Sequence, residues 1–462
     1  MTYASKLLPF ARRHDAVAAC LATALVLPTA ALADSHLLFP IGEGPFDWAG
    51  YEAFAAENDF TGETLTMTGV GTGDDAARLR NLYAYFTHAT GAEVQYSGSE
   101  SFEQDIVIAT RAGSAPHIAT FPQPGLARDL AAQGFLTPID GLSDWVAENY
   151  AAGSSWVDLA TFAGPEGDAG LYGLFYGVDV KSLVWYVPEA FEEAGYAVPR
   201  SMEDLKALTE QIVADGGTPW CIGIGSAAAT GWPATDWVED MMLRTQPPEV
   251  YDAWVANDMP FDDPRVVAAI EEYGWFARNP DFVEGGGRTV AATDFRDSVL
   301  GLFSFPPDCL LHRQASFIPN FFPEGVELGT DVDFFYFPAY AGKDLGRPVL
   351  GSGGLVTITR DAPVARAFIE FLKTPVAHEI FMAQGNFLTP HLGANDATYA
   401  NETQRAMGQI LTDATTFRFD ASDLMPGEIG TSAFWNAMVE YTTGTPAEEV
   451  TRAVQDRWDS IR

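Results

Sequence analysis

Hydrophobic and polar residues in the first third of the chain follow two alternating periods. Residues 64–68 have the two-residue period of a strand, 93–96 and 117–121 are predicted to be further strands, and each run precedes a predicted helix. This β-α-β-α-β-α order predicts a parallel sheet covered by helices, and therefore an α/β fold. Ligands of such sheets bind beyond the carboxyl ends of the strands, which here are residues 71–74, 97–100 and 121–125.

The stretch 172–187 has the pattern of an extended segment that leaves one lobe and enters another. It is mostly β-branched and aromatic, Gly173 and Gly177 interrupt it, and Pro188 follows. An ordinary buried strand would have the same composition. Helix-rich sequence comes next, and strand patterns return at 220–224, 299–305 and 333–337.

A chain of 462 residues is too long for one average core, so two lobes or domains are expected. The formal net charge of −37 argues against nucleic acid and anionic membrane surfaces as partners, because both would be repelled.

The N-terminus has the pattern of a secretory signal peptide over residues 1–33. Lys6, Arg12 and Arg13 precede an apolar run at 16–30 that is too short to span a bilayer, and residues 31–33 form a small-residue cleavage site. We therefore expect export to the periplasm and a mature chain that starts at Asp34. The alternative is a lipid anchor at Cys20, because residues 17–20 resemble a lipoprotein box.

Cleavage after residue 33 leaves two cysteines, Cys221 and Cys309. Two cysteines in an exported protein favour one disulfide, and two separate buried thiols are the alternative.

The sequence contains no clear motif for binding a nucleotide cofactor or a metal ion. Gly69, Gly71 and Gly73 have the spacing G-x-G-x-G rather than G-x-G-x-x-G, and Asp74 and Asp75 would repel a pyrophosphate at the following helix N-terminus. The histidines show no ligand spacing. We therefore expect neither a cofactor nor a metal.

Several segments, in their shared order along the chain, resemble extracellular solute-binding proteins (family 1) of carbohydrate ABC importers. These segments are 172–186, 229–236, 307–309, 312–316, 351–354, 424–426 and 432–435. Segments 101–108 and 121–125 resemble the α-glucoside-binding members, which are relatives of maltose- and trehalose-binding proteins.

This resemblance implies a two-lobe periplasmic-binding-protein fold with a ligand cleft at the hinge. The first lobe would comprise residues 34–180 and 336–385. The second lobe would comprise 181–335 and 386–462, the latter with the C-terminal helices.

The resemblance also places an acidic residue at the hinge, at Asp179, and a sugar-stacking aromatic residue at Trp435. A tryptophan expected near Cys309 or Leu310 is absent, and Asn436 replaces a tyrosine. Both departures favour ligands shorter than maltodextrins.

The physical chemistry of a pyranose agrees, since it needs flat aromatic faces for its C–H surfaces and carboxylates, amides or guanidinium groups for its hydroxyls. The expected ligand-binding residues are Gly73, Asp74, Ser99, Glu100, Phe121, Gln123, Asp179, Trp232, Asp236, Gln314, Gly353, Gly354, Arg418 and Trp435. Trp185 and Trp237 fit a buried core better than a ligand contact, and Phe121 and Trp232 fit either role equally well. Arg418 fits a surface ion pair with Asp420 or Asp423 equally well.

The expected function is that of a monomeric substrate-binding component of an ABC importer, without catalytic activity. It would bind an α-glucoside of the maltose, trehalose or sucrose type and deliver it to membrane permease subunits. The alternatives are a binder of another polar solute, such as glucosylglycerol, a polyol or an oligopeptide, and a secreted glycoside hydrolase that uses two carboxylates.

Overall fold

The computed structural model describes residues 37–461 of the protein, except residues 152 and 386. The expected signal peptide and Cys20 lie outside these described residues. Within the described ranges, every helix is too short or too polar to cross a membrane.

A six-stranded mixed sheet and the helices that cover it form the first group of elements, which includes segments from late in the chain. The strands of this sheet are β1 (Thr64–Gly69), β2 (Glu93–Gly98), β3 (Ile118–Phe121), β6 (Gly173–Val180), β10 (Pro348–Ile358) and β11 (Thr416–Phe419). The order is β11-β10-β3-β1-β2, and β6 pairs with β10 outside this path. The pairs β1–β2, β1–β3 and β10–β11 are parallel, whereas β10 runs antiparallel to β3 and β6.

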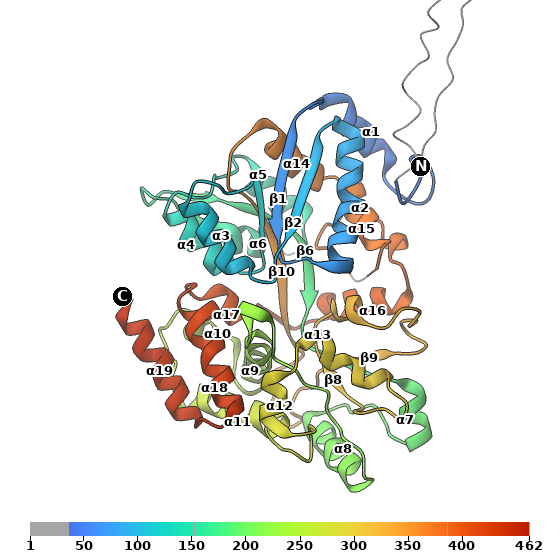
Figure 1. The fold of residues 1–462 in the computed structure, drawn as a ribbon, viewed down its shortest axis with the longest axis vertical. Helices are drawn as coiled ribbons and strands as arrows, with labels where there is room; N and C mark the ends of the chain where they lie inside the picture. The colour runs from blue at the N-terminus through green and yellow to red at the C-terminus, as the bar shows by residue number, and fades with distance from the viewer. Residues whose placement is uncertain (1–36, 152, 386, 462) are drawn as a thin grey trace, which may run out of the picture. The chain divides into compact units, whose positions relative to one another are not determined.

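Helices cover both faces of this sheet. The chain moves from β1 to β2 in one direction and from β2 to β3 in the other, so right-handed crossovers place the connecting helices on opposite faces. Figure 1 shows α2 and α15 on one side of the β1–β2 pair and α3 and α4 on the other. The helices of this part are α1 (Trp48–Glu57), α2 (Gly73–Thr90), α3 (Phe102–Arg111), α4 (Pro124–Ala132), α5 (Leu142–Asn149), α6 (Gly153–Ala160), α14 (Pro363–Leu372) and α15 (Pro375–Met382).

Local sequence explains the bounds of α2. Asp74 and Asp75 lie in its first turn, where carboxylates interact favourably with the helix dipole. The helix ends at Gly91, which has a positive φ of 73° that glycine adopts without a Cβ clash.

A second group of elements surrounds a three-stranded antiparallel sheet of β7 (Leu183–Tyr186), β8 (His312–Arg313) and β9 (Asp333–Tyr336), in the order β8-β7-β9. Its helices are α7 (Pro188–Ala194), α8 (Met202–Ala214), α9 (Trp232–Thr245), α10 (Pro248–Val255), α11 (Pro264–Ala277), α12 (Gly286–Ala292), α13 (Phe295–Ser298), α16 (Glu402–Thr412), α17 (Ala421–Leu424), α18 (Trp435–Thr443) and α19 (Ala447–Ser460). Shorter elements are the hairpin of β4 (Thr161–Ala163) and β5 (Ala169–Leu171), the 3₁₀ segments Ala227–Ala229, Val299–Phe303, Ile318–Phe321 and Asp396–Thr398, and a π-helical turn at Ile429–Phe434.

The expected extended segment at 172–187 consists of two strands, β6 and β7, which lie in different sheets. Residues 181 and 182 join them. Phe175 of β6 packs in one hydrophobic cluster and Val184 of β7 packs in another, whereas Val180 and Leu183, which flank the link, share a third cluster. The link therefore stands between the two largest hydrophobic clusters, and a smaller cluster spans it.

Two strand predictions are wrong. Val299–Phe303 forms a 3₁₀ segment, and Trp220 makes only a single bridge to Leu311 before irregular backbone. Short apolar runs of this kind carry no periodicity that separates a strand from a helical turn.

The disulfide between Cys221 and Cys309 is present, so the alternative of two free thiols is excluded. Both cysteines are buried and pack with Val299 and Leu302. The bond joins positions 88 residues apart in the sequence.

Replacing both cysteines by serine should lower the free energy of unfolding by roughly 3–5 kcal/mol, because the disulfide closes a long loop in the unfolded chain. Urea unfolding of the oxidised wild type and of the Cys221→Ser/Cys309→Ser variant measures the difference. The Ala228→Ser variant, altered at an exposed position, is the control. Equal midpoints for the double variant and the wild type would contradict the expectation.

Candidate functional site

A cavity of about 310 Å³ lies where the carboxyl ends of the first sheet face the second group of elements. The first group contributes Glu100, Thr120 and Gln123, which stand after or at the end of β2 and β3. The second group contributes residues of α9, α13, α17 and α18. The volume is at the lower end of the range of about 300–1,000 Å³ found for small-molecule sites.

Aromatic side chains form much of the wall. Trp232 is half-buried, and its ring meets that of Phe295 edge-on with centroids 4.8 Å apart. Trp435 is 3% exposed, and Phe317 and Phe321 complete the wall on this side. Flat rings of this kind match the apolar face of a pyranose.

Two polar atoms of the pocket wall are free to form hydrogen bonds with a ligand. Trp435 Nε1 and Gln123 Oε1 are buried and have no hydrogen-bond partner among the residues that the structure describes. Gln123 Nε2 meanwhile donates to Glu103 Oε1 at 2.9 Å, which fixes the orientation of the amide. A buried polar group without a partner is costly, so these atoms are suited to ligand hydroxyls.

Polar contacts join the two groups of elements beside the pocket. Arg296 of α13 lies 3.8 Å from the carboxylate of Glu100, and Asn320 donates to Asp75. Burial raises the pKa of Asp75 to about 6, although Arg78 and Arg296 act against this shift.

Asp179 stands in β6 at the pocket wall and accepts a hydrogen bond from Ser316 Oγ at 3.1 Å. Burial raises the pKa of its carboxyl to about 6, against the opposing charge of Lys181. A carboxyl in this position can accept hydrogen bonds from ligand hydroxyls.

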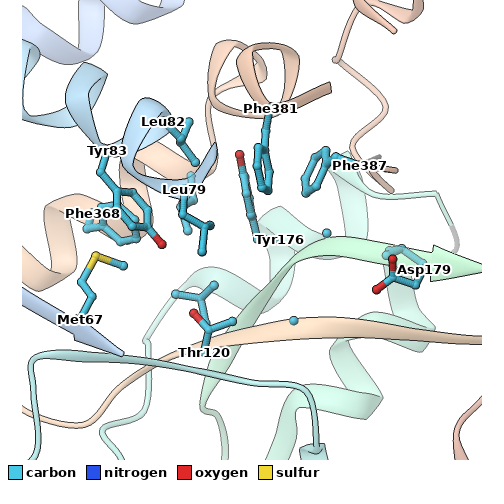
Figure 2. A pocket seen from close by; sticks show the side chains of 15 residues that line it. Met67, Leu79, Leu82, Tyr83, Thr120, Tyr176, Asp179, Phe368, Phe381 and Phe387 are labelled. Carbon is cyan, nitrogen blue, oxygen red and sulfur yellow. The ribbon is translucent and has the colours of Figure 1, made fainter. Parts of the chain in front are cut away.

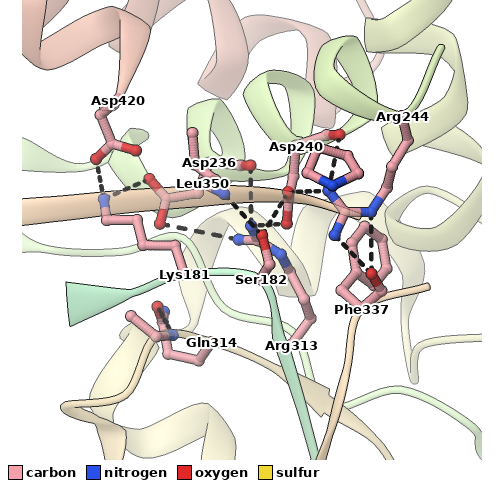
Figure 3. Close-up of polar contacts among 12 residues, drawn as sticks. Lys181, Ser182, Asp236, Asp240, Arg244, Arg313, Gln314, Phe337, Leu350 and Asp420 are labelled. Atoms are coloured by element: carbon pink, nitrogen blue, oxygen red, sulfur yellow. Dashed lines mark hydrogen bonds and ion pairs between the residues drawn. The ribbon is translucent and has the colours of Figure 1, made fainter. Parts of the chain in front are cut away.

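A buried charge cluster lies beneath the pocket, around the link between β6 and β7 (Figure 3). The ammonium of Lys181 lies 2.8 Å from Asp236 Oδ1 and also pairs with Asp420. Farther in, Arg313 Nη2 donates to Asp240 Oδ2 at 2.7 Å, and Ser182 Oγ donates to Asp240 Oδ1 at 2.8 Å. Members of the cluster come from α9, from β8 and from the residues around α17, so the cluster ties these elements to the link.

Acidic groups outnumber cationic groups in this cluster. Its members are Lys181, Arg244 and Arg313 on the cationic side, and Asp236, Glu239, Asp240, Asp420 and Asp423 on the acidic side. Burial raises the pKa of Asp236 to about 7, and burial together with neighbouring carboxylates raises the pKa values of Glu239 and Asp423 well above their ordinary range. Protons retained on these groups bring the cluster closer to neutrality.

The carboxylates of Asp236, Glu239 and Asp420 lie within 4.8 Å of one another, as the ligands of a metal ion would. The ammonium of Lys181 already provides a cation to two of them. This group is therefore an ion-pair cluster in the structure.

The pocket brings together eight of the residues expected from the sequence: Glu100, Gln123, Asp179, Trp232, Asp236, Gly353, Gly354 and Trp435. The remaining six lie elsewhere. Gly73 and Asp74 are exposed at the start of α2, and Ser99 Oγ donates to Asp105.

The other three are held by partners away from the pocket. Phe121 is fully buried against Phe102, and Gln314 Oε1 accepts from the backbone N–H of Ala315. Arg418 pairs with Asp252 at 2.6 Å rather than with Asp420 or Asp423. As expected, Trp185 and Trp237 belong to the buried core.

Sequence reasoning missed several residues of the pocket: Asp75, Lys181, Phe295, Arg296, Phe317, Asn320, Phe321, Asp420 and Asp423. Lys181 offered one usable signal, since it lies in the predicted link only two residues after Asp179. Asp75 stands in the first turn of α2, one residue after the expected Asp74, and the others stand on or beside short helical segments whose positions no regular period fixes.

Two groups of elements with a pocket between them are the arrangement of a ligand-binding protein. Comparison with known families agrees with this class. Residues 71–379 match the family described as bacterial extracellular solute-binding protein, and the chain belongs to this family. Its members bind solutes, so the expectation of a non-enzymatic binding protein is confirmed.

Two curated relatives cover most of the chain. It is 59% identical over 431 residues, 93% of this chain and 94% of the relative, to the alpha-glucosides-binding periplasmic protein AglE of Rhizobium meliloti (strain 1021). It is 40% identical over 394 residues, 85% of this chain and 92% of the relative, to the osmoprotective compounds-binding protein GgtB of Synechocystis sp..

Solved structures show the same fold at low identity. The solute receptor AcbH matches with a TM-score of 0.73 at 18% identity, covering 86% of this chain and 99% of the receptor. Maltose-bound MalE3 of T. maritima matches with a TM-score of 0.66 at 15% identity, covering 86% of this chain and all of that chain. The predicted α/β periplasmic-binding-protein fold is therefore confirmed.

The raised pKa of Glu239 predicts a pH-dependent effect on stability. The folded protein retains the proton on Glu239, whereas the unfolded chain loses it above about pH 4.3, so wild-type stability falls as the pH rises from there toward the folded-state pKa. Glu239→Gln removes this loss. The variant should therefore gain stability over the wild type at pH 8 and gain much less at pH 5.

Urea unfolding at pH 5, 6.5 and 8 measures this difference, with the exposed Glu249→Gln on α10 as the matched control. A variant that is destabilised equally at all three pH values would show that the wild type holds Glu239 ionised.

Proposed function

We propose that this protein is the substrate-binding component of an ABC sugar importer and that it binds an α-glucoside in the 310 Å³ pocket. The ligand class is supported by the 59% identity, over nearly the full length of both chains, to a protein named for α-glucoside binding in the periplasm. By the same argument we place the mature protein in the periplasm.

The observation that carries the proposal is the chemistry of the pocket wall. Trp232 and Trp435 offer aromatic faces, and Asp179, Gln123 and the Trp435 indole offer an acceptor carboxyl, an amide and an N–H. This combination matches a pyranose, which needs apolar contact above its ring and hydrogen bonds at its rim. The small volume favours a disaccharide over a longer chain.

We further propose that the two groups of elements act as lobes, with first-lobe segments 34–180 and 336–385 and second-lobe segments 181–335 and 386–462, except that β11 within the last segment pairs with β10 in the first sheet. The separate hydrophobic clusters before and after the link support this division. In this arrangement the protein acts as a monomer and delivers its sugar to membrane permease subunits.

A second candidate ligand class consists of compatible solutes such as glucosylglycerol. It is supported by the 40% identity to an osmoprotective compounds-binding protein. Glucosylglycerol is itself an α-linked glucoside with a small polyol aglycone, so the same pocket chemistry would accept its glucose ring.

A ligand panel tests the proposal. Maltose, trehalose or sucrose should raise the melting temperature of the mature protein, because binding at a hundredfold over the Kd adds about 2.7 kcal/mol to its stability. Glucosylglycerol, mannitol and a tripeptide complete the panel. Stabilisation by the tripeptide or by mannitol, with none by any glucoside, would overturn the α-glucoside assignment.

Variants locate the site by isothermal titration with the best sugar of the panel. Trp232→Ala should weaken binding by about 1–3 kcal/mol through lost stacking area, and Asp179→Asn should weaken it by removing a charged acceptor. Arg418→Ala, whose side chain pairs with Asp252 away from the pocket, is the matched control and should leave the affinity unchanged. Unchanged affinity in both pocket variants would place the sugar elsewhere.

A further inference from the structure

A second cavity, of about 170 Å³, adjoins the proposed sugar pocket. The two cavities share the lining residues Thr120, Asp179, Gly354, Phe381 and Phe387. These shared residues place the two cavities side by side.

The chemistry of the second cavity differs from that of the first. Beyond the shared residues its wall is apolar and aromatic, with Leu79, Leu82 and Tyr83 from α2 and Phe368 from α14. Figure 2 shows Tyr83, Phe368 and Met67 gathered at one end, and Asp179 at the other. Apart from the hydroxyl of Tyr83 the interior is thus apolar, and the carboxyl of Asp179 marks the end that faces the sugar pocket.

The aromatic rings around the cavity are already packed against one another. The centroids of Phe381 and Phe387 lie 4.5 Å apart, and the rings of Tyr176 and Phe381 stack at 6.0 Å with an interplanar angle of 12°. The hydroxyl of Tyr176 donates to the backbone carbonyl of Ala377 at 2.6 Å, so it is not directed at a ligand. Such a wall offers ring contacts and few hydrogen bonds.

This wall selects among possible ligand groups. A second sugar ring in the cavity would bury hydroxyls without partners, which is costly, whereas a phenyl ring needs none. An apolar cavity of about 150 Å³ is large enough to hold benzene. The dimensions and the chemistry therefore match a single aromatic ring.

We propose that this cavity is a subsite for the aglycone of an aryl α-glucoside, with the glucose ring in the adjoining polar pocket. The proposal rests on the α-glucoside function proposed above and deepens it. The glycosidic oxygen would lie at the shared rim beside Thr120 and Asp179. A disaccharide would keep both of its rings in the polar pocket.

Isothermal titration with three ligands tests the proposal: maltose, methyl α-D-glucoside and phenyl α-D-glucoside. The wild type should bind the phenyl glucoside at least tenfold more tightly than the methyl glucoside, because the phenyl ring leaves water for the apolar cavity. If maltose binds and the phenyl and methyl glucosides bind with equal affinities, the subsite proposal is wrong and the proposed function is still supported. Failure of maltose and of both glucosides to bind would overturn the proposed function and the subsite with it.

A cavity-filling variant locates the aryl group. Leu79 is only partly buried, so Leu79→Phe can add a ring toward the cavity from α2. It should abolish the preference for the phenyl glucoside and leave maltose affinity within twofold. The exposed Ile108→Phe on α3 is the matched control and should keep the preference.

Two outcomes would overturn this placement: a phenyl preference that survives Leu79→Phe, or an equal loss of maltose and phenyl glucoside affinity in that variant. If Leu79→Phe does not fold, the ratio of phenyl to methyl glucoside affinity in the wild type still decides the proposal.

Discussion

The ion pairs of Lys181 hold together the region from which the binding pocket is built. Its ammonium is almost fully buried between Asp236 of α9 and Asp420, which follows β11, and it stands on the link between the two sheets. Removing one partner of a buried pair typically costs 3–5 kcal/mol, because the other charge stays buried without compensation. Asp236 and Asp420 also line the pocket, so the same interaction that joins the elements fixes part of the binding surface.

The regular part of the architecture could be predicted from the sequence, together with the site residues that depend on it. Glu100 and Gln123 were expected at the pocket because parallel strands end at one edge of a sheet, and both lie there. Asp179 was expected from the resemblance to solute-binding proteins, which implies an acidic residue at the hinge. The disulfide followed from the small number of cysteines in an exported chain.

The remainder depended on tertiary packing that no period encodes. From the sequence, Arg418 could equally have contacted a ligand or formed an ion pair. It pairs with Asp252 because β11 packs beside α10. Gly73 and Asp74 follow the correct strand, but the first turn of α2 leaves them exposed while Asp75 reaches the pocket. Phe295 and Asn320 stand on short helical turns, which a sequence pattern does not orient.

The sugar pocket and the adjoining apolar cavity fit two chemically different parts of a ligand. Aromatic faces and unpartnered hydrogen-bonding groups in the larger cavity are suited to a hydroxylated ring. The smaller cavity is suited to a group without hydroxyls. Asp179 belongs to both walls, so its carboxyl stands where the two parts of a ligand would join. The selectivity of the protein would then arise from this division as well as from the recognition of glucose.

A crystal structure of the mature protein with bound maltose would test the central claim most directly. We predict electron density for the sugar in the 310 Å³ pocket, with a ring against Trp232 or Trp435 and hydroxyls on Asp179 and Gln123. Sugar density outside this pocket, with Trp232 and Asp179 free of contacts to it, would contradict the assignment.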